Sequence, residues 1–159
     1  MPDPKPQAAG ERCDAAVQPL ADLDALDDSP VVRDGGATRL RGSRSASSGV
    51  ACFPAAAVCP RTGARDMSPA EFGPAGTLYS FSTLHVSSRF PTPRTMGYVD
   101  LPDSDADPDS DPDLDPNDGG RVVRVLAEVR GKIDALHCDA AVGLHSDADG
   151  RWWVEAVAP

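Results

Sequence analysis

The chain has 159 residues and a formal net charge of −10 at pH 7, a length that favours a single domain. The charge is unevenly spread: residues 1–34 carry eight acidic and three basic residues, and residues 103–118 carry eight Asp and no basic residue. The remainder is mildly basic, which excludes both a uniformly acidic surface and a strongly basic nucleic-acid face.

No stretch approaches the ~18 apolar residues of a membrane helix, and the first residues lack the apolar region of a secretory signal. We therefore expect a cytoplasmic protein whose four cysteines are reduced thiols. Cys52 and Cys59 are close enough in sequence to pair if they were oxidised.

Residues 1–36 are predicted to be a disordered tail, because they offer too little apolar surface to offset the entropy of ordering them. The segment that follows, 37–70, begins with a short strand at 37–44. Its next part, RSASSGVACFPAAAVCPRTG at 44–63, has the Gly, Pro and Ser density of two turns.

Residues 71–159 contain the pattern of an all-β barrel. Apolar and β-branched runs predict five strands, with a short helical link between the third and fourth and an Asp-Gly turn between the last two. Three strands, a helical link and two more strands is the order of a five-stranded OB-fold barrel. The predicted strands are 76–88, 95–101, 121–131, 140–146 and 151–159, the link is 132–138 and the turn is 147–150.

The Asp-rich segment 103–118 lies between the second and third predicted strands. Carboxylates are ligands for Ca²⁺, but an EF-hand frame started at Asp113 places Asp118 and Arg124 where the loop requires Gly and Glu. Interleaved prolines also oppose a helix or an inner strand. The segment is therefore predicted to be a solvated, disordered insert.

The region from about Leu40 to Pro159 resembles the zinc-ribbon/OB-fold proteins associated with acyl-CoA metabolism, in which a rubredoxin-like zinc ribbon precedes an OB fold. The resemblance is carried by the order and spacing of several segments. These are the SG…CFP…CP…TG frame at 48–63, GTLYSFSTLHV at 76–86, PTPRTMGYVDL at 91–101, RVLAEVRG at 124–131 and the terminal AVAP.

The zinc ligands of that family map to Ser45, Ser48, Cys59 and Thr62 in this chain. Three of these four residues cannot supply a thiolate, and structural zinc requires four soft or imidazole ligands. We therefore expect a degenerate, metal-free zinc-ribbon remnant, looser than its zinc-bearing relatives.

The resemblance implies a protein without chemistry of its own: an accessory subunit that binds a thiolase-like or acyltransferase partner and helps form its acyl-CoA site or scaffold the complex. The partner would supply the catalytic residues. No tightly bound cofactor is expected, and a coenzyme A thioester would be shared with the partner. We predict no catalytic residue in this chain, because no G-x-S-x-G or H-E-x-x-H motif occurs and nothing brings Cys59 to a histidine.

Two sets of residues are candidates for binding. Arg89, Phe90 and Arg94 flank a proline loop at the end of the barrel, and arginines there would suit the phosphates of coenzyme A. Trp152 and Trp153 alternate on the last strand, so one is expected to face the core and the other to face outward as an interface candidate.

The alternative function is an OB fold that binds single-stranded nucleic acid. Such folds combine a basic groove with stacking aromatic side chains. The mildly basic barrel and the eight aromatic residues of the whole chain, four Phe, two Tyr and two Trp, make this the second choice.

Overall fold

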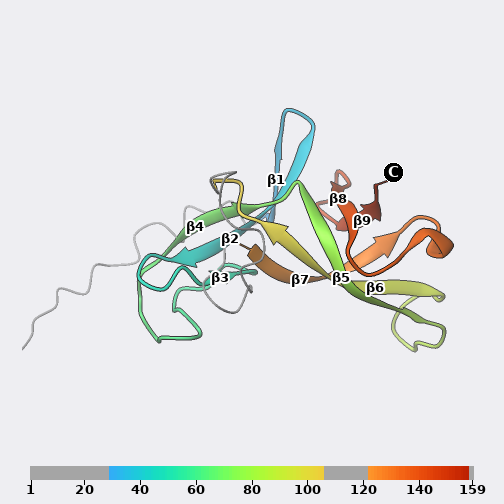
Figure 1. Ribbon diagram of the computed structural model, residues 1–159, viewed down its shortest axis with the longest axis horizontal. Coiled ribbons are helices and arrows are strands. Elements are labelled where there is room, and N and C mark those ends of the chain that lie inside the picture. Colours follow the sequence, from blue (N-terminus) through green and yellow to red (C-terminus); the bar gives the residue numbers. More distant parts are fainter. Residues whose placement is uncertain (1–28, 106–121, 158–159) are drawn as a thin grey trace, which may run out of the picture.

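The computed structural model describes residues 29–105 and 122–157. These residues form a small N-terminal sheet beside a closed five-stranded barrel (Figure 1), which confirms the predicted all-β class and the barrel. Residues 1–28 of the predicted tail and residues 106–118 of the predicted insert lie outside the described residues.

Nine strands and one 3-10 turn make up the described part of the chain. The N-terminal sheet contains β1 (Val31–Asp34), β2 (Ala37–Ser45), β3 (Ala51–Cys52) and β4 (Met67–Phe72). The barrel contains β5 (Ala75–Leu84), β6 (Arg94–Pro102), β7 (Val122–Arg130), the turn η2 (Ile133–Ala135), β8 (Ala140–Ser146) and β9 (Trp152–Ala156).

The barrel closes in the order β5-β6-β7-β9-β8. All pairs are antiparallel except β7 with β9, which run parallel. The predicted order of three strands, a short link and two strands is therefore confirmed. β5 ends at Leu84, four residues before the predicted strand, because the Ser87 hydroxyl accepts the backbone N–H groups of Arg89 and Phe90 and turns the chain.

The N-terminal sheet is built around β2, which pairs with β1, β3 and β4. Two parts of it depart from the sequence prediction. Residues 31–34, assigned to the disordered tail, form β1, since a Gly-Gly turn at 35–36 with positive φ folds them back on β2. The sequence pattern predicts no strand at residues 67–72, yet these residues form β4, which pairs with β2 over six residues.

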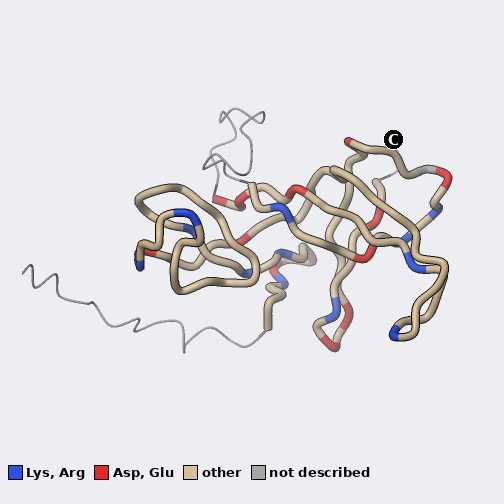
Figure 2. The backbone as a smooth tube through the Cα atoms, turned by 90° about the horizontal axis from the view of Figure 1, so that it is seen from below, with Lys and Arg blue, Asp and Glu red and all other residues tan. Residues whose placement is uncertain are grey.

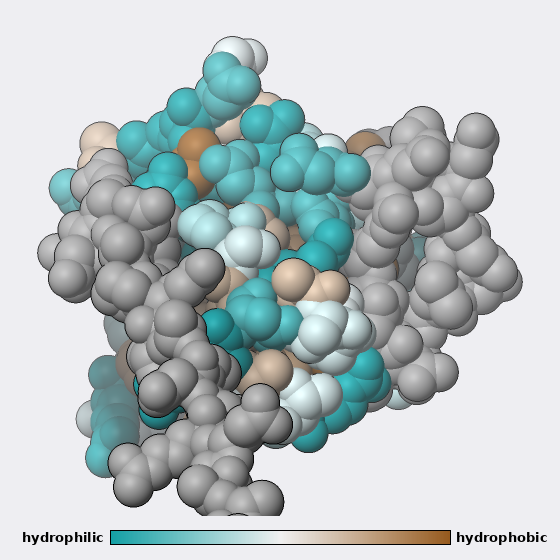
Figure 3. All heavy atoms as spheres, turned by 90° about the vertical axis from the view of Figure 1, so that its left-hand side faces the viewer, coloured by the Kyte–Doolittle hydropathy of each residue, from teal (hydrophilic) through white to brown (hydrophobic). Residues whose placement is uncertain are grey.

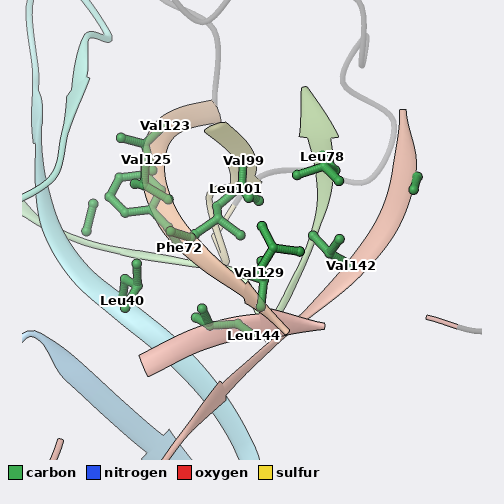
Figure 4. Packing of buried hydrophobic residues seen from close by; sticks show 14 residues of the cluster. Leu40, Phe72, Leu78, Val99, Leu101, Val123, Val125, Val129, Val142 and Leu144 are labelled. Atoms are coloured by element: carbon green, nitrogen blue, oxygen red, sulfur yellow. The ribbon is translucent and has the colours of Figure 1, made fainter. Parts of the chain in front are cut away.

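One hydrophobic core serves both parts. Leu40 of β2 and Phe72 of β4 are fully buried in the same cluster as Leu78, Val99 and Leu101 of the barrel (Figure 4). Burial of a large apolar side chain stabilises by about 1.5–3 kcal/mol, so the sheet is held to the barrel by its own core residues.

Gly97 leaves room for the neighbouring strand β5 where its pairing with β6 is irregular. A Cβ atom at this position would lie 2.8 Å from Leu78 Cδ1 and 2.8 Å from the carbonyl oxygen of Ser80. The pairing of the two strands shifts between Leu78 and Ser80, at the same place. The space that a side chain at Gly97 would need is therefore already filled.

A clamp of polar groups joins the sheet to the barrel where β4 leads toward β5. Phe72 and Asp103 form an isolated antiparallel β-bridge, and the buried carboxylate of Asp103 forms an ion pair with Arg44 of β2.

Within the described ranges, no helix is long and apolar enough to cross a membrane.

Candidate functional site

The outer wall formed by β5, β6 and β7 carries a group of exposed apolar side chains. Tyr98 of β6 is paired with Leu126 of β7, and alternate residues of paired strands share a face. The bulge after Leu78 turns Tyr79 outward on the neighbouring strand. Tyr79, Tyr98 and Leu126 are 51%, 48% and 54% exposed. Together with half-buried Met96 they are called the tyrosine face below.

An ion pair borders the tyrosine face on one side. Arg124 donates two hydrogen bonds to the carboxylate of Asp100, at 2.7 and 2.8 Å, and its guanidinium carbon lies 3.5 Å from the centre of the Tyr79 ring. The hydrogen bonds to Asp100 raise the pKa of Arg124 above its usual value. Arg124 is therefore charged, and it already interacts with the Asp100 carboxylate and the Tyr79 ring of the barrel.

A second ion network borders the other side. The carboxylate of Glu128 contacts both Arg94 and Arg130, with a distance of 2.8 Å to Arg130 Nε. Burial raises the pKa of Glu128, but the hydrogen bonds from Arg130 and Arg94 outweigh burial and leave that pKa below its ordinary value. This network ties the start of β6 to the end of β7.

The three residues predicted to contact coenzyme A lie at the β5–β6 hairpin. Arg89 and Phe90 are exposed in the loop, and Arg94 is the first residue of β6. The structure brings Arg94 over the Phe90 ring, with 5.1 Å from its guanidinium carbon to the ring centre. It also pairs Arg94 with Glu128. By contrast, no carboxylate of the described residues forms an ion pair with Arg89.

The two tryptophans of β9 face opposite ways, as the alternation predicted. Trp152 packs against the core and meets Phe53 edge-on, with 5.7 Å between ring centres. Trp153 faces outward between Arg130, 3.9 Å from its ring centre, and the His145 ring, stacked at 6.1 Å. Its Nε1–H donates to Glu155 at 2.9 Å. The outward ring is thus in contact with side chains of both neighbouring strands, β7 and β8.

The residues at the four zinc-ligand positions of the resembled family cluster in two turns. The N–H groups of Gly49 and Gly63 donate to the carbonyls of Ser45 and Cys59, both at 2.9 Å. Ser48 Oγ lies 2.9 Å from Ser45 Oγ and 3.4 Å from Cys59 Sγ. Hydrogen bonds from Ser48 and Thr62 lower the pKa of Cys59 to about 6.

This cluster does not fit zinc. Ser45 donates its hydroxyl to Asp66 at 2.9 Å, and three of the four positions offer neutral hydroxyls in place of thiolates. The described ranges hold no set of three His, Cys, Asp or Glu residues arranged around one point. Hydrogen bonds among the hydroxyls, the Cys59 sulfur and the Asp66 carboxylate connect these residues.

Sequence reasoning did not find the tyrosine face. Tyr79, Tyr98 and Leu126 are 19 and 28 residues apart in the chain, and only the pairing of three strands makes them neighbours. The alternation in RVVRVLAEVR, with Arg124, Leu126 and Glu128 on one side of the strand, is the signal that was available.

The fold resembles a solved chain whose structure is titled the Ltp2-ChsH2(DUF35) aldolase. The match covers 74% of this chain and 84% of that chain, with a TM-score of 0.52 and 21% sequence identity. The sequence matches no protein-family model and no curated protein. The structural comparison establishes a shared fold over that part of the chain.

Proposed function

We propose that the chain is a non-catalytic accessory subunit that binds a thiolase-like or acyltransferase partner and helps form its acyl-CoA site or scaffold the complex. The observation that carries the proposal is the shared fold with the Ltp2-ChsH2(DUF35) aldolase chain over about three quarters of this chain. A five-stranded barrel was also expected from the zinc-ribbon/OB-fold resemblance, and its presence here supports the same class of protein.

The surroundings of the cysteines support a role without catalysis. Cys59 is 1% exposed, and its sulfur is hydrogen-bonded with the hydroxyls of Ser48 and Thr62 and with the backbone N–H groups of Thr62 and Arg61. A nucleophilic cysteine needs an accessible sulfur and an adjacent base. His85, one residue beyond the end of β5, is exposed. The reacting groups would then come from the partner.

The β5–β6 hairpin is the proposed contact for coenzyme A. Arg89 would bind phosphate, since its charge is not engaged by a described carboxylate, and exposed Phe90 would lie beside the adenine or pantetheine. Arg94 would support Phe90 by its contact with the ring, because its own charge is balanced by Glu128. The three residues would thus have different roles in one binding site.

Binding of single-stranded nucleic acid is disfavoured because arginines of the barrel already form ion pairs with carboxylates. Arg94, Arg124 and Arg130 each contact a carboxylate on the barrel, whereas a polyanion is bound by cations free to replace its counterions. Basic and acidic residues are interspersed along the described backbone (Figure 2). The barrel therefore lacks the continuous basic groove of that function over its described residues.

Co-expression of the full chain with the thiolase-like enzymes encoded in the same genome tests the proposal. We expect one of them to co-purify in a fixed ratio through size-exclusion chromatography with light scattering, and the chain alone to show no acyl transfer or carbon–carbon cleavage. Co-purification with none of them, or full activity of the chain alone, would refute the proposed function.

A further inference from the structure

We infer that hydrogen bonds of Cys59 and Asp66 hold the two turns of the N-terminal sheet in place, in the structural role that a metal ion has in the resembled family. The turns are residues 45–49 and 59–63. Their side chains do not suit zinc, yet the structure connects the turns to each other and to β4. The inference stands whether or not the chain is an accessory subunit, because it rests on contacts among the described residues.

The two turns have the same backbone structure. In both, the N–H of the fifth residue donates to the carbonyl of the first at 2.9 Å, from Gly49 to Ser45 and from Gly63 to Cys59. In both, the N–H of the first residue donates to the carbonyl of the residue after the glycine, at 3.0 and 2.8 Å. The two glycines have positive φ angles of 70° and 73°, which a glycine adopts without strain. The chain therefore builds one kind of turn twice, an observation that needs no resemblance.

Polar contacts join the first turn to the second. Ser48 Oγ lies 3.4 Å from Cys59 Sγ, and Arg61 Nη2 donates to the carbonyl of Ser48 at 3.3 Å. The hydroxyl of Thr62 also hydrogen-bonds with the Cys59 sulfur. Cys59 is 1% exposed, so water does not compete for its hydrogen bonds. Removing such a bond leaves a buried polar group without a partner, which is costlier than losing a bond at the surface.

Asp66, the residue before β4, ties the first turn to the sheet. One of its carboxylate oxygens accepts the Ser45 hydroxyl at 2.9 Å, and the other accepts the backbone N–H of Ser47 at 2.7 Å. Its backbone carbonyl accepts the N–H of Ala46 at 3.1 Å. Three oxygens of one residue thus hold three consecutive residues of the turn. Hydrogen bonds to an ionised carboxylate are about twice as strong as those between neutral groups, so Asp66 is the strongest acceptor of the network.

Apolar packing contributes little to holding the second turn. The hydrophobic core of the described residues includes Ala51 and Phe53 as partly buried neighbours, but no residue from 54 to 66. Seen from the end of the molecule at which the N-terminal sheet lies, the described surface is mostly hydrophilic (Figure 3). Hydrogen bonds are therefore the main links between this turn and the rest of the sheet.

The network makes the N-terminal sheet independent of metal supply. A structural zinc site takes its folding free energy from the bound ion, and a chelator removes that free energy. Here every link between the turns, and from the first turn to β4, is a bond between groups of the chain itself. The sheet should therefore form fully without any metal ion, and its stability should depend on Asp66 instead.

Hydrogen–deuterium exchange of the full chain tests the role of Asp66. We expect Asp66→Ala to speed exchange of the amides at 46–49 by about 10-fold or more, because local opening no longer breaks bonds to the carboxylate. Asp66→Asn keeps one side-chain oxygen as an acceptor, so its effect should be smaller. Asp149→Asn, at an exposed position in the turn between β8 and β9, is the matched control and should change nothing. Exchange in β7 should be the same in all variants.

A chelator and added zinc test the role of metal on the unsubstituted chain. Neither should change exchange at 45–49 and 59–63 or the thermal midpoint. Faster exchange after chelation, or a higher midpoint with zinc, would show that a metal holds the turns and would overturn the inference. Unchanged exchange at 46–49 in Asp66→Ala, or an equal acceleration in β7, would also overturn it. If Asp66→Ala fails to fold, the comparison of Asp66→Asn with Asp149→Asn decides in the same way.

Discussion

Arg44 and Asp103 form an ion pair that joins the N-terminal sheet to the barrel. The Asp103 side chain is 3% exposed and that of Arg44 is 24% exposed. A second oxygen of the same carboxylate accepts the backbone N–H of Asp105 at 2.9 Å. The pair sits beside the Phe72–Asp103 bridge, so one carboxylate anchors the strands of both sheets at their junction.

Replacing Arg44 by Met should destabilise the chain by about 3 kcal/mol, because it leaves the buried Asp103 carboxylate without its cation. Removing both charges, in Arg44→Met/Asp103→Leu, should cost less than Arg44→Met alone, since no unpaired charge then remains buried. Urea unfolding followed by circular dichroism measures both. A cost for Arg44→Met within about 0.5 kcal/mol of zero would show that the pair does not secure the junction.

Gly97→Ala should destabilise the barrel by about 1–3 kcal/mol, the cost of forcing an extra methyl group into a packed site. The added Cβ would meet Leu78 Cδ1 and the Ser80 carbonyl at 2.8 Å. Ser82→Ala, at an exposed position on β5, is the control and should change stability by less than about 0.5 kcal/mol. Equal unfolding midpoints for the two variants would contradict the tight packing around Gly97.

The barrel was predictable from the sequence because its signal is local. Each strand carries its own apolar alternation, and the Asp-Gly turn at 147–150 marks the hairpin between β8 and β9. β4 was missed because MSPAEF has a central proline and little alternation. Its strand is imposed by pairing with β2, a tertiary effect that outweighs local preference.

The candidate site was less predictable because it depends on register. The sequence suggests Arg94 as an anion ligand, but its pairing with Glu128 across β6 and β7 follows only from which residues oppose each other. The tyrosine face likewise depends on the bulge at Tyr79, and a one-residue slip reverses the side on which every side chain lies.

Glu128 should make stability fall at acidic pH. Its pKa in the folded chain lies below the ordinary value because Arg130 and Arg94 donate to its ionised form. The unfolded chain therefore takes up a proton first as the pH falls. The stabilisation is fully present above the ordinary carboxyl pKa of about 4.3 and is lost as the pH falls through the lower folded value.

Glu128→Gln should thus cost up to about 1 kcal/mol at pH 7, and the difference from the unsubstituted chain should vanish at strongly acidic pH. Urea unfolding across this pH range measures it. Asp134→Asn, at an exposed position in η2, is the control and should leave the pH profile unchanged. A difference that persists at the acidic end would mean that packing, rather than charge, accounts for the effect of Glu128→Gln.

Fluorescence anisotropy with a labelled single-stranded oligonucleotide at low salt should show no tight binding. The guanidinium groups of Arg94, Arg124 and Arg130 are already bound to carboxylates, so few counterions would be released from the nucleic acid. Tight binding that weakens steeply with added salt would instead favour the nucleic-acid function over the accessory subunit.

The two turns of the N-terminal sheet should accept a metal once the missing thiols are restored. Ligand sulfurs around one tetrahedral zinc lie roughly 3.8 Å apart, given Zn–S bonds of about 2.3 Å. Ser48 Oγ is already 3.4 Å from Cys59 Sγ and 2.9 Å from Ser45 Oγ, so the turns hold near-ligand spacing through hydrogen bonds alone.

The triple variant Ser45→Cys/Ser48→Cys/Thr62→Cys should therefore bind one zinc ion per chain and unfold at a higher temperature when loaded, because metal binding to the folded state adds to folding free energy. Elemental analysis and the visible spectrum of the cobalt form measure it. The same variant with Cys59→Ser lacks the fourth thiolate and should bind the metal far more weakly. One zinc per chain in the unsubstituted protein would show that the hydroxyl cluster has not replaced the metal, and no binding by the triple variant would show that the turns no longer keep the geometry of a zinc ribbon.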